Sequence, residues 1–295
     1  MKKFIIALIV IILIGLGIWV ITTRKPETTE TPETATTTNA TTTPVALEET
    51  SIGISIKGRE IPIYHFGEGD KEVLFVGGIH GGYEWNTVLL SYELIDFLEA
   101  NPDEIADGVT VSVIPVLNPD GLEEVVGTSG RFTKEDVPTA KSETIPGRFN
   151  ANDVDLNRNF DCDWQATGVW QQTPVSGGTG AFSERESQAM KAYIEKNDPD
   201  AVVVFYSSAG GVFASNCHGG VSEETLELTN LYAKASGYPA YEEFDFYDIT
   251  GDMVNWLAKE SIPAISVLLT THDTTEWEKN WKGADAVIEY VASQE

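Results

Sequence analysis

The chain has 295 residues, of which 42% are hydrophobic, and a formal net charge of −27 at pH 7. Setting aside an atypical N-terminal stretch of about 50 residues leaves a length that fits one large domain with a sizeable core. Acidic residues are spread along the chain without any basic run, so the electrostatic field repels phosphate backbones and no nucleic-acid partner is expected.

Residues 1–23 have the character of a membrane anchor. After Lys2 and Lys3, residues 4–21 form an uninterrupted run of apolar residues and glycine, long enough for a helix to cross the hydrocarbon layer. A cleaved signal peptide would have a shorter apolar region followed by small residues. We therefore expect an uncleaved, single-pass helix in the cell membrane, with the long acidic remainder on the extracytoplasmic side.

Residues 24–50 are rich in Thr, Pro and Glu and contain few large apolar side chains, which predicts a disordered linker. Residues 51–295 then form the folded domain. Its two cysteines, Cys162 and Cys217, are expected to form one disulfide in an oxidising compartment. The alternative is two unrelated buried thiols.

Strands and helices are predicted to alternate along this domain. The predicted strands cover residues 51–64 as an edge hairpin, 73–76, 109–116, 201–206 and 262–269. The predicted helices cover residues 85–98, 183–194, 222–235, 253–259 and 276–292. This order predicts an α/β fold, a single domain with a mixed, mostly parallel central sheet covered by helices on both faces, and ligands at the carboxyl ends of strands.

A first group of chemically useful residues follows the predicted strand 73–76. The glycine-rich run that starts there places His80 and Glu84 between a strand and a helix. Imidazole nitrogen and carboxylate oxygen are both good zinc ligands, and glycines allow the tight turn that would bring them together. The alternative is a glycine-rich turn whose histidine and glutamate are merely solvated.

A second group resembles the substrate-carboxylate site of the M14 zinc carboxypeptidases. It consists of Arg148-Phe149-Asn150 and Asp155-Leu156-Asn157-Arg158-Asn159-Phe160. A planar guanidinium can hold a carboxylate through two parallel hydrogen bonds, although a structural salt bridge is the simpler alternative. The resemblance covers residues 73–288, with further landmarks at Asn118-Pro119-Asp120-Gly121, Phe182-Ser183-Glu184, Tyr247, Thr250-Gly251 and Trp256.

The resemblance implies a role for each residue of the site. His80 and Glu84 would bind Zn²⁺, Asn157 and Arg158 would hold the free C-terminal carboxylate of a peptide, and Tyr247 would close over the bound residue. Arg148 would polarise the scissile carbonyl. The implied activity is a zinc metallocarboxypeptidase that removes C-terminal residues from extracytoplasmic peptides, including cell-wall peptides, by attack of a metal-activated water.

Three positions depart from the family pattern. His80 and Glu84 are separated by three residues instead of two. The third zinc ligand, a histidine after the central strand, is replaced by Ser207, so that His218 or His272 would have to reach the metal from a loop. The general-base glutamate is replaced by Leu268-Leu269; Asp273 or Glu276 could stand in, although a carboxylate at position 276 also suits a helix start.

Two alternative functions follow from these departures. One is a catalytically impaired protein that binds peptide carboxyl ends through Arg148, Asn157 and Arg158. The other is a zinc amidase or deacylase on the same scaffold. Val254, near the presumed side-chain pocket, favours an apolar terminal residue in the ligand.

Overall fold

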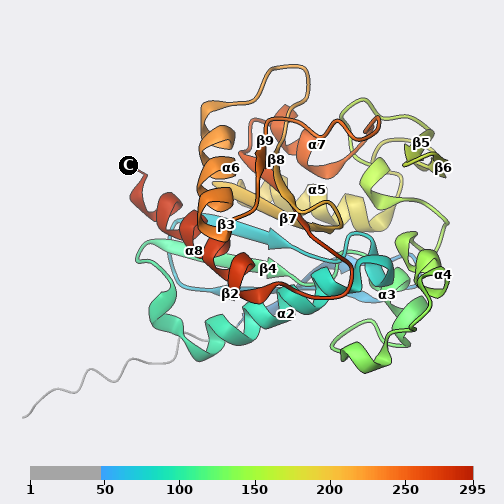
Figure 1. The fold of residues 1–295 in the computed structure, drawn as a ribbon, viewed down its shortest axis with the longest axis horizontal. Helices are drawn as coiled ribbons and strands as arrows, with labels where there is room; N and C mark the ends of the chain where they lie inside the picture. Colours follow the sequence, from blue (N-terminus) through green and yellow to red (C-terminus); the bar gives the residue numbers. More distant parts are fainter. Residues whose placement is uncertain (1–47, 295) are drawn as a thin grey trace, which may run out of the picture. The chain divides into compact units, whose positions relative to one another are not determined.

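The computed structural model describes residues 48–294 (Figure 1). The predicted anchor at residues 1–23 and most of the predicted linker lie outside this range. Strand β1 (Glu48–Ile54) begins within the last residues assigned to the linker. None of the helices in residues 48–294 is both long and apolar enough to cross a membrane.

An eight-stranded sheet forms the centre of the domain, with the strand order β1-β2-β4-β3-β7-β10-β8-β9. The remaining strands of this sheet are β2 (Glu60–Phe66), β3 (Lys71–Val76), β4 (Val109–Ile114), β7 (Ala201–Ser207), β8 (Gly211–Ala214), β9 (Ala240–Tyr241) and β10 (Ala264–Leu269). The four central strands, β4, β3, β7 and β10, run parallel, and β1, β2 and β8 pair antiparallel with their neighbours. The mixed, mostly parallel sheet predicted from the sequence is confirmed.

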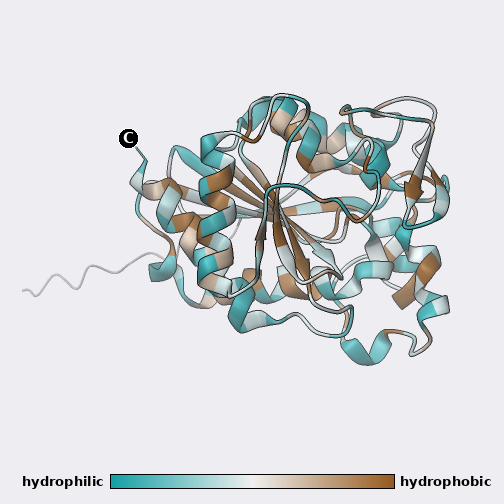
Figure 2. Cartoon of the chain, turned by 45° about the horizontal axis from the view of Figure 1, so that its top comes forward, coloured by the Kyte–Doolittle hydropathy of each residue, from teal (hydrophilic) through white to brown (hydrophobic). Residues whose placement is uncertain are grey.

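Helices cover both faces of this sheet, as predicted. One face packs against α2 (Trp85–Ala100), α6 (Glu223–Ser236) and α8 (Trp277–Ser293), and the other against α5 (Arg185–Asn197) and α7 (Met253–Lys259). Figure 2 shows the apolar strands between helices whose outer sides are hydrophilic. Shorter elements lie beyond the strand ends: α3 (Pro119–Val126), α4 (Lys141–Thr144), the 3-10 turns η1 (Gly81–Glu84), η2 (Pro102–Glu104), η3 (Lys134–Asp136), η4 (Ile145–Arg148) and η5 (Leu156–Arg158), and the hairpin β5 (Thr167–Trp170) and β6 (Thr173–Ser176).

The register of the two central strands β7 and β10 decides which side chains face the same way. All residues of both strands are buried, which explains why their sequences are apolar except for Ser207 and Ser266. Tyr206 pairs with Leu268, and Ser207 pairs with Leu269. Since successive side chains of a strand point to opposite faces, Tyr206 and Leu268 lie on the α5/α7 face and Leu269 lies on the α2/α6/α8 face.

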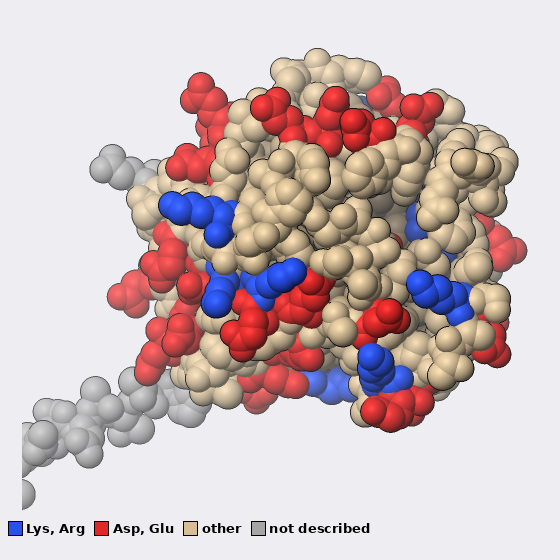
Figure 3. Space-filling model, in the orientation of Figure 1, with Lys and Arg blue, Asp and Glu red and all other residues tan. Residues whose placement is uncertain are grey.

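Charged residues cover the surface of the domain. On the face shown in Figure 3, acidic side chains are widely distributed and the basic ones stand singly or in small groups among them. Binding of a phosphate backbone is favoured by a basic patch or stripe. The face shown in Figure 3 presents no such patch, in keeping with the net charge of −27.

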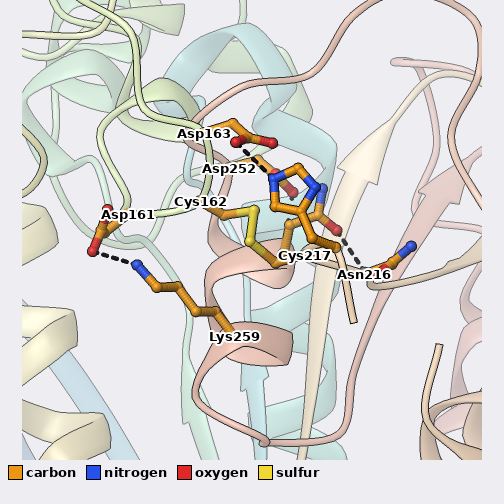
Figure 4. The surroundings of a disulfide bond; sticks show 9 residues. Asp161, Cys162, Asp163, Asn216, Cys217, Asp252 and Lys259 are labelled. Carbon is orange, nitrogen blue, oxygen red and sulfur yellow. Dashed lines mark hydrogen bonds and ion pairs between the residues drawn. A yellow bond between two sulfur atoms is a disulfide. The ribbon is translucent and has the colours of Figure 1, made fainter. Parts of the chain in front are cut away.

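The predicted disulfide between Cys162 and Cys217 is confirmed, with a Cα–Cα distance of 6.0 Å. It joins the loop after η5 to the loop after β8 (Figure 4). Both loops contribute to the same cavity, so the bond fixes part of the cavity wall.

Replacing both cysteines by serine is expected to lower the free energy of unfolding by about 4 kcal/mol, because the bond closes a long loop in the unfolded chain. The linked residues are 55 positions apart. Chemical denaturation measures the change. Each single replacement should lower the free energy of unfolding as much as the double one, since either removes the bond. An unfolding midpoint that does not change when reductant is added would contradict the prediction.

Candidate functional site

Close backbone packing positions the first part of the site. Turn η1, helix α3 and turn η4 meet through Gly81, Gly121 and Gly147. A Cβ atom on Gly81 would lie 2.7 Å from the carbonyl oxygen of Gly147, and one on Gly121 would lie 2.3 Å from the same oxygen. Any larger residue would separate the three segments. The glycines therefore bring His80 and Arg148, which flank these turns, to the same place.

His80 and Glu84 converge as predicted. The Nδ1 atom of His80 lies 3.1 Å from the Oε2 atom of Glu84. Both residues are buried, and neither atom makes a hydrogen bond to any described residue. The residue added relative to the family's His-x-x-Glu spacing is absorbed by the 3-10 turn η1, which returns Glu84 to the imidazole. The pair therefore places an imidazole nitrogen and a carboxylate oxygen, both common types of metal ligand, side by side in a buried position.

Asp155, to which the sequence assigned no role, links this pair to Arg148. Its Oδ1 atom lies 3.2 Å from His80 Nε2, and its Oδ2 atom accepts hydrogen bonds from Nε and Nη2 of Arg148 at 2.9 and 2.7 Å. Burial alone would raise the pKa of Asp155, but the charges of Arg148 and His80 outweigh it and hold this pKa well below its usual range. Metal-binding histidines are usually oriented by a carboxylate that contacts the ring nitrogen not bound to the metal. Asp155 contacts Nε2, the nitrogen of His80 that does not face Glu84.

Arg148 is enclosed on its other sides by aromatic rings. Its guanidinium carbon lies 4.5 Å from the ring centroid of Trp170 and 5.6 Å from that of Tyr83. Cation–π contacts of this kind hold the planar group in one orientation. Because Nε and Nη2 already bind Asp155, Arg148 can offer a ligand only its remaining N–H groups.

Arg158 and Asn157 present free hydrogen-bond donors side by side. Arg158 donates from Nε and Nη2 to the carbonyl oxygen of Val169, and from Nη1 to that of Asn157, which leaves one N–H on each terminal nitrogen without an acceptor in the described structure. Asn157 Oδ1 accepts from the Tyr206 hydroxyl and the Met253 amide, both at 3.1 Å, so its Nδ2 group remains available. These donors suit a carboxylate.

Tyr247 lies over this pair of donors. Its ring centroid is 6.0 Å from the guanidinium carbon of Arg158. Burial raises the pKa of Tyr247, against the opposing charges of Arg148 and Arg158, so the hydroxyl is neutral at pH 7 and can donate a hydrogen bond. The structure therefore brings Tyr247 to the arginine predicted to hold the carboxylate, and its closure over a bound residue stays a prediction.

The ends of β7 and β10 place Tyr206 and Leu268 in the site. The ring centroid of Tyr206 lies 5.9 Å from that of His80, and Leu268 lines the same cavity. Sequence analysis put the departures from the family at Ser207 and at Leu268-Leu269. The structure moves the first to Tyr206 and assigns the second to Leu268, because Leu269 faces the opposite core. A tyrosine and a leucine occupy the two strand-end positions that line the cavity together with His80.

Ser207 belongs instead to a structural hydrogen-bond chain. Asn86 Nδ2 donates to the carbonyl oxygens of Thr271 and Thr274, so Asn86 Oδ1 can only accept, and it accepts the Ser207 hydroxyl at 3.0 Å. His272 Nδ1, 2.9 Å from Ser207 Oγ, must then donate to it. Burial lowers the pKa of His272, which favours the neutral ring. Ser207 therefore has no hydrogen left for a ligand.

The other residues considered from the sequence lie elsewhere. The side chain of His218 is 74% exposed and bonded to Asp163 at 2.8 Å. Glu276 accepts hydrogen bonds from the amide and hydroxyl of Thr270 at 2.6 and 2.9 Å. It lies at the start of α8, which agrees with the alternative that this carboxylate suits a helix start. Asp273 lines a smaller neighbouring cavity of about 570 Å³. The predicted catalytic role of Glu276 has no geometric basis, since its carboxylate is fully engaged outside the site.

The donors near His80 are too few for a catalytic zinc ion. His80 Nδ1 and Glu84 Oε2 are buried and free of hydrogen bonds, and Asp155 supports the imidazole. Catalytic zinc sites use three protein ligands and a water. Within residues 48–294, no group of three or more His, Cys, Asp or Glu side chains is arranged to hold a metal ion. The residues present therefore supply two ligands and do not match a catalytic zinc site.

All of these groups share one cavity of about 1140 Å³. Of the predicted site residues, it is lined by His80, Glu84, Arg148, Asn157, Arg158 and Tyr247. Its volume exceeds that of most small-molecule pockets, which is about 300–1,000 Å³. The cavity therefore has room for several residues of a peptide.

The sequence is similar to those of known metallopeptidases. A family model described as zinc carboxypeptidase, peptidase M14, matches residues 33–280. Gamma-D-glutamyl-L-diamino acid endopeptidase 1 of Lysinibacillus sphaericus is 25% identical over 221 residues, which are 68% of this chain and 55% of that protein. Metallocarboxypeptidase A of Arthroderma otae is 26% identical over 258 residues, 77% of this chain and 59% of that protein. The chain thus spans somewhat more than half the length of these relatives.

Solved structures show the same fold. Carboxypeptidase A from Helicoverpa armigera superimposes with a TM-score of 0.64 at 18% identity, covering 85% of this chain and 69% of that one. Murein-tripeptide amidase MpaA from Escherichia coli O157 does so with a TM-score of 0.55 at 20% identity, covering 84% and 92%. Because the family model matches most of the sequence and the fold agrees, the chain belongs to the M14 zinc carboxypeptidase family.

Proposed function

We propose that this cavity binds peptides by their free C-terminal carboxylate and that hydrolysis of the bound peptide is impaired. The observation that supports binding is the pair of buried donors at Asn157 and Arg158. In a protein of net charge −27, a buried guanidinium with unused N–H groups is costly unless an anion completes its hydrogen bonds. Tyr247 and Arg148 line the same cavity and add further hydrogen-bond donors.

The impairment is inferred from the two strand ends. The phenol of Tyr206 donates to Asn157, and phenols are not among the usual zinc ligands. Leu268 has no group that can accept a proton from water. The chain would thus retain the recognition part of a carboxypeptidase site without its full catalytic part.

A second candidate is the activity implied by the family, zinc-dependent removal of C-terminal residues. The observation that favours it is the buried His80–Glu84 pair, free of hydrogen bonds and oriented by Asp155. These two residues would supply two of the three protein ligands that a catalytic zinc ion needs. The amidase or deacylase alternative shares this requirement.

The nature and location of the peptide are inferred from the relatives and the N-terminus. One relative is named for a gamma-D-glutamyl-L-diamino acid peptide, and one protein of the same fold is named for a murein tripeptide. If residues 1–23 form the predicted single-pass anchor, the domain is held at the outer side of the cell membrane. We propose an extracytoplasmic, cell-wall-type peptide as the ligand.

Arg158→Met is expected to weaken binding of a peptide with a free C-terminus by about 10- to 100-fold, because a charge-assisted hydrogen-bonded pair is lost. The same peptide with an amidated C-terminus should bind wild type and variant equally weakly. Calorimetric titration measures all four affinities. Arg131→Met is the matched control, since Arg131 is exposed and pairs with Asp96 away from the cavity. Equal affinity of wild type for acid and amide would refute the proposal.

A further inference from the structure

A second cavity, of about 570 Å³, adjoins the main one. The two cavities have Tyr83, Trp170, Gln171, Ser208 and His272 in common in their walls. Most of the other residues that line the second cavity belong to the segment 134–145, between α3 and η4. Its volume falls within the range of about 300–1,000 Å³ that is usual for small-molecule pockets. The second cavity can therefore hold a chemical group of its own.

A row of three aromatic rings forms the wall that the cavities share. The ring centroid of Tyr83 lies 5.0 Å from that of Trp170 and 4.9 Å from that of His272. Burial raises the pKa of Tyr83 to about 12, so its hydroxyl is neutral at pH 7. Arg158 and Glu84 line the main cavity and not the second. A peptide whose C-terminus is held at Arg158 can thus continue past this wall into the second cavity.

Two lysines give the second cavity a positive charge. Lys134 and Lys141 both line it, and Asp273 is the one acidic residue of its lining. The ion pairs formed within residues 48–294 include neither lysine. This is so although acidic residues outnumber basic ones by 46 to 19 in the chain. The second cavity therefore has an excess of positive charge in a strongly acidic protein.

The surroundings of the two lysines leave N–H groups for an anion. Lys134 Nζ donates to the carbonyl oxygen of Asp273 at 2.8 Å and lies 5.9 Å from the ring centroid of Trp85. The hydrogen bond uses one of its three N–H groups. Burial lowers the pKa of His272, and the charge of Lys141 lowers it further, which places Lys141 near the shared wall. Both positive groups therefore act on the second cavity, and a negatively charged ligand group would complement them.

We propose that the second cavity binds a carboxylate on a residue upstream of the ligand's C-terminal residue, with Lys134 and Lys141 as the anion-binding groups. This inference rests on the proposed function, because the terminal carboxylate is held in the main cavity by Asn157 and Arg158. The ligand is then a peptide with two separate negative groups. Ile145, whose side chain is apolar and exposed, lines the second cavity and suits the aliphatic part of the acidic residue.

Calorimetric titration with matched peptides tests the inference. Each peptide has a free C-terminal carboxylate and alanine at every position except one, which is glutamate in one peptide and glutamine in its match. That position is the second, third or fourth from the C-terminus. At low ionic strength, wild type is expected to bind the glutamate peptide at least about 5-fold more tightly at one of these positions, as two exposed ion pairs allow.

Variants assign the preference to the two lysines. Lys134→Met and Lys141→Met should each reduce the preference for glutamate, and the double variant should abolish it. The matched control is the double variant Lys196→Met, Lys234→Met, which removes the same charge from exposed positions that line neither cavity, and it should keep the preference. All four lysines are exposed, so every variant is expected to fold, and near-ultraviolet circular dichroism checks this.

The outcomes separate the inference from the proposed function. Equal affinities of wild type for the glutamate and glutamine peptides at all three positions would overturn the anionic subsite and leave binding of the terminal carboxylate intact. A preference that persists without Lys134 and Lys141, or that is lost equally in the control variant, would overturn the subsite as well. Failure of wild type to bind any of the peptides would overturn the proposed function itself.

Discussion

The double variant Tyr206→His, Leu268→Glu is expected to hydrolyse a carboxylate-terminated peptide at least about 100-fold faster than wild type, the contribution typical of a positioned acid–base group. The two residues are neighbours in the β7–β10 register and share the face that carries His80. A histidine at 206 would add a third ligand to His80 and Glu84, and a glutamate at 268 would add a proton acceptor. The release of the terminal residue, followed by mass spectrometry with zinc present, measures the gain.

Matched variants separate the two contributions. Tyr206→His with Leu268→Gln should bind zinc, measured by elemental analysis, without the gain in turnover, because glutamine has the size of glutamate but cannot take a proton. Tyr206→Phe removes only the hydroxyl and should gain neither property. Wild-type turnover equal to that of the double variant would show that Tyr206 and Leu268 do not limit hydrolysis.

Asp155→Ala is expected to lower the free energy of unfolding by about 3–5 kcal/mol, the usual cost of breaking a buried ion pair. Asp155 and Arg148 are both almost completely buried, and the variant leaves the guanidinium without its bidentate partner. Urea denaturation at neutral pH measures the loss. As a control, Asp161→Ala breaks an exposed pair with Lys259 and should cost less than about 1 kcal/mol.

The pH dependence of this stabilisation has a definite sign. The pKa of Asp155 is lower in the folded protein than in the unfolded chain, so its ionised form favours folding. The contribution is complete above the ordinary aspartate pKa of about 4 and is lost as the pH falls below it. The difference between wild type and Asp155→Ala should therefore shrink in acid. A difference that is independent of pH would contradict the assignment.

The fold was predictable because the central strands are buried on both faces. The unbroken apolar run at 201–206 and the mostly apolar run at 262–269, separated by helix-forming segments, indicate a parallel sheet. The sequence also predicted that His80, Glu84, Arg148, Asn157, Arg158 and Tyr247 belong together, and all of them line one cavity. Those residues were recognisable because they occur in short runs whose spacing resembles that of a known family.

Other parts of the site depend on pairings that distant segments make only in three dimensions. Ser207 and Tyr206 differ by one position, but that difference decides which face of the sheet a side chain occupies, and the face is set by the neighbouring strands. Asp155 lies within a recognised run, but its partner His80 is 75 residues away.

The mass of a peptide recovered from its complex with the wild-type chain tests the central claim most directly. The chain is incubated with excess zinc and a peptide that has a free C-terminal carboxylate, the complex is isolated by gel filtration, and the mass of the bound peptide is measured by mass spectrometry. The structure predicts that the peptide is recovered with the chain at its full mass. A peptide shortened by its last residue, or one that does not travel with the chain, would contradict binding without efficient hydrolysis.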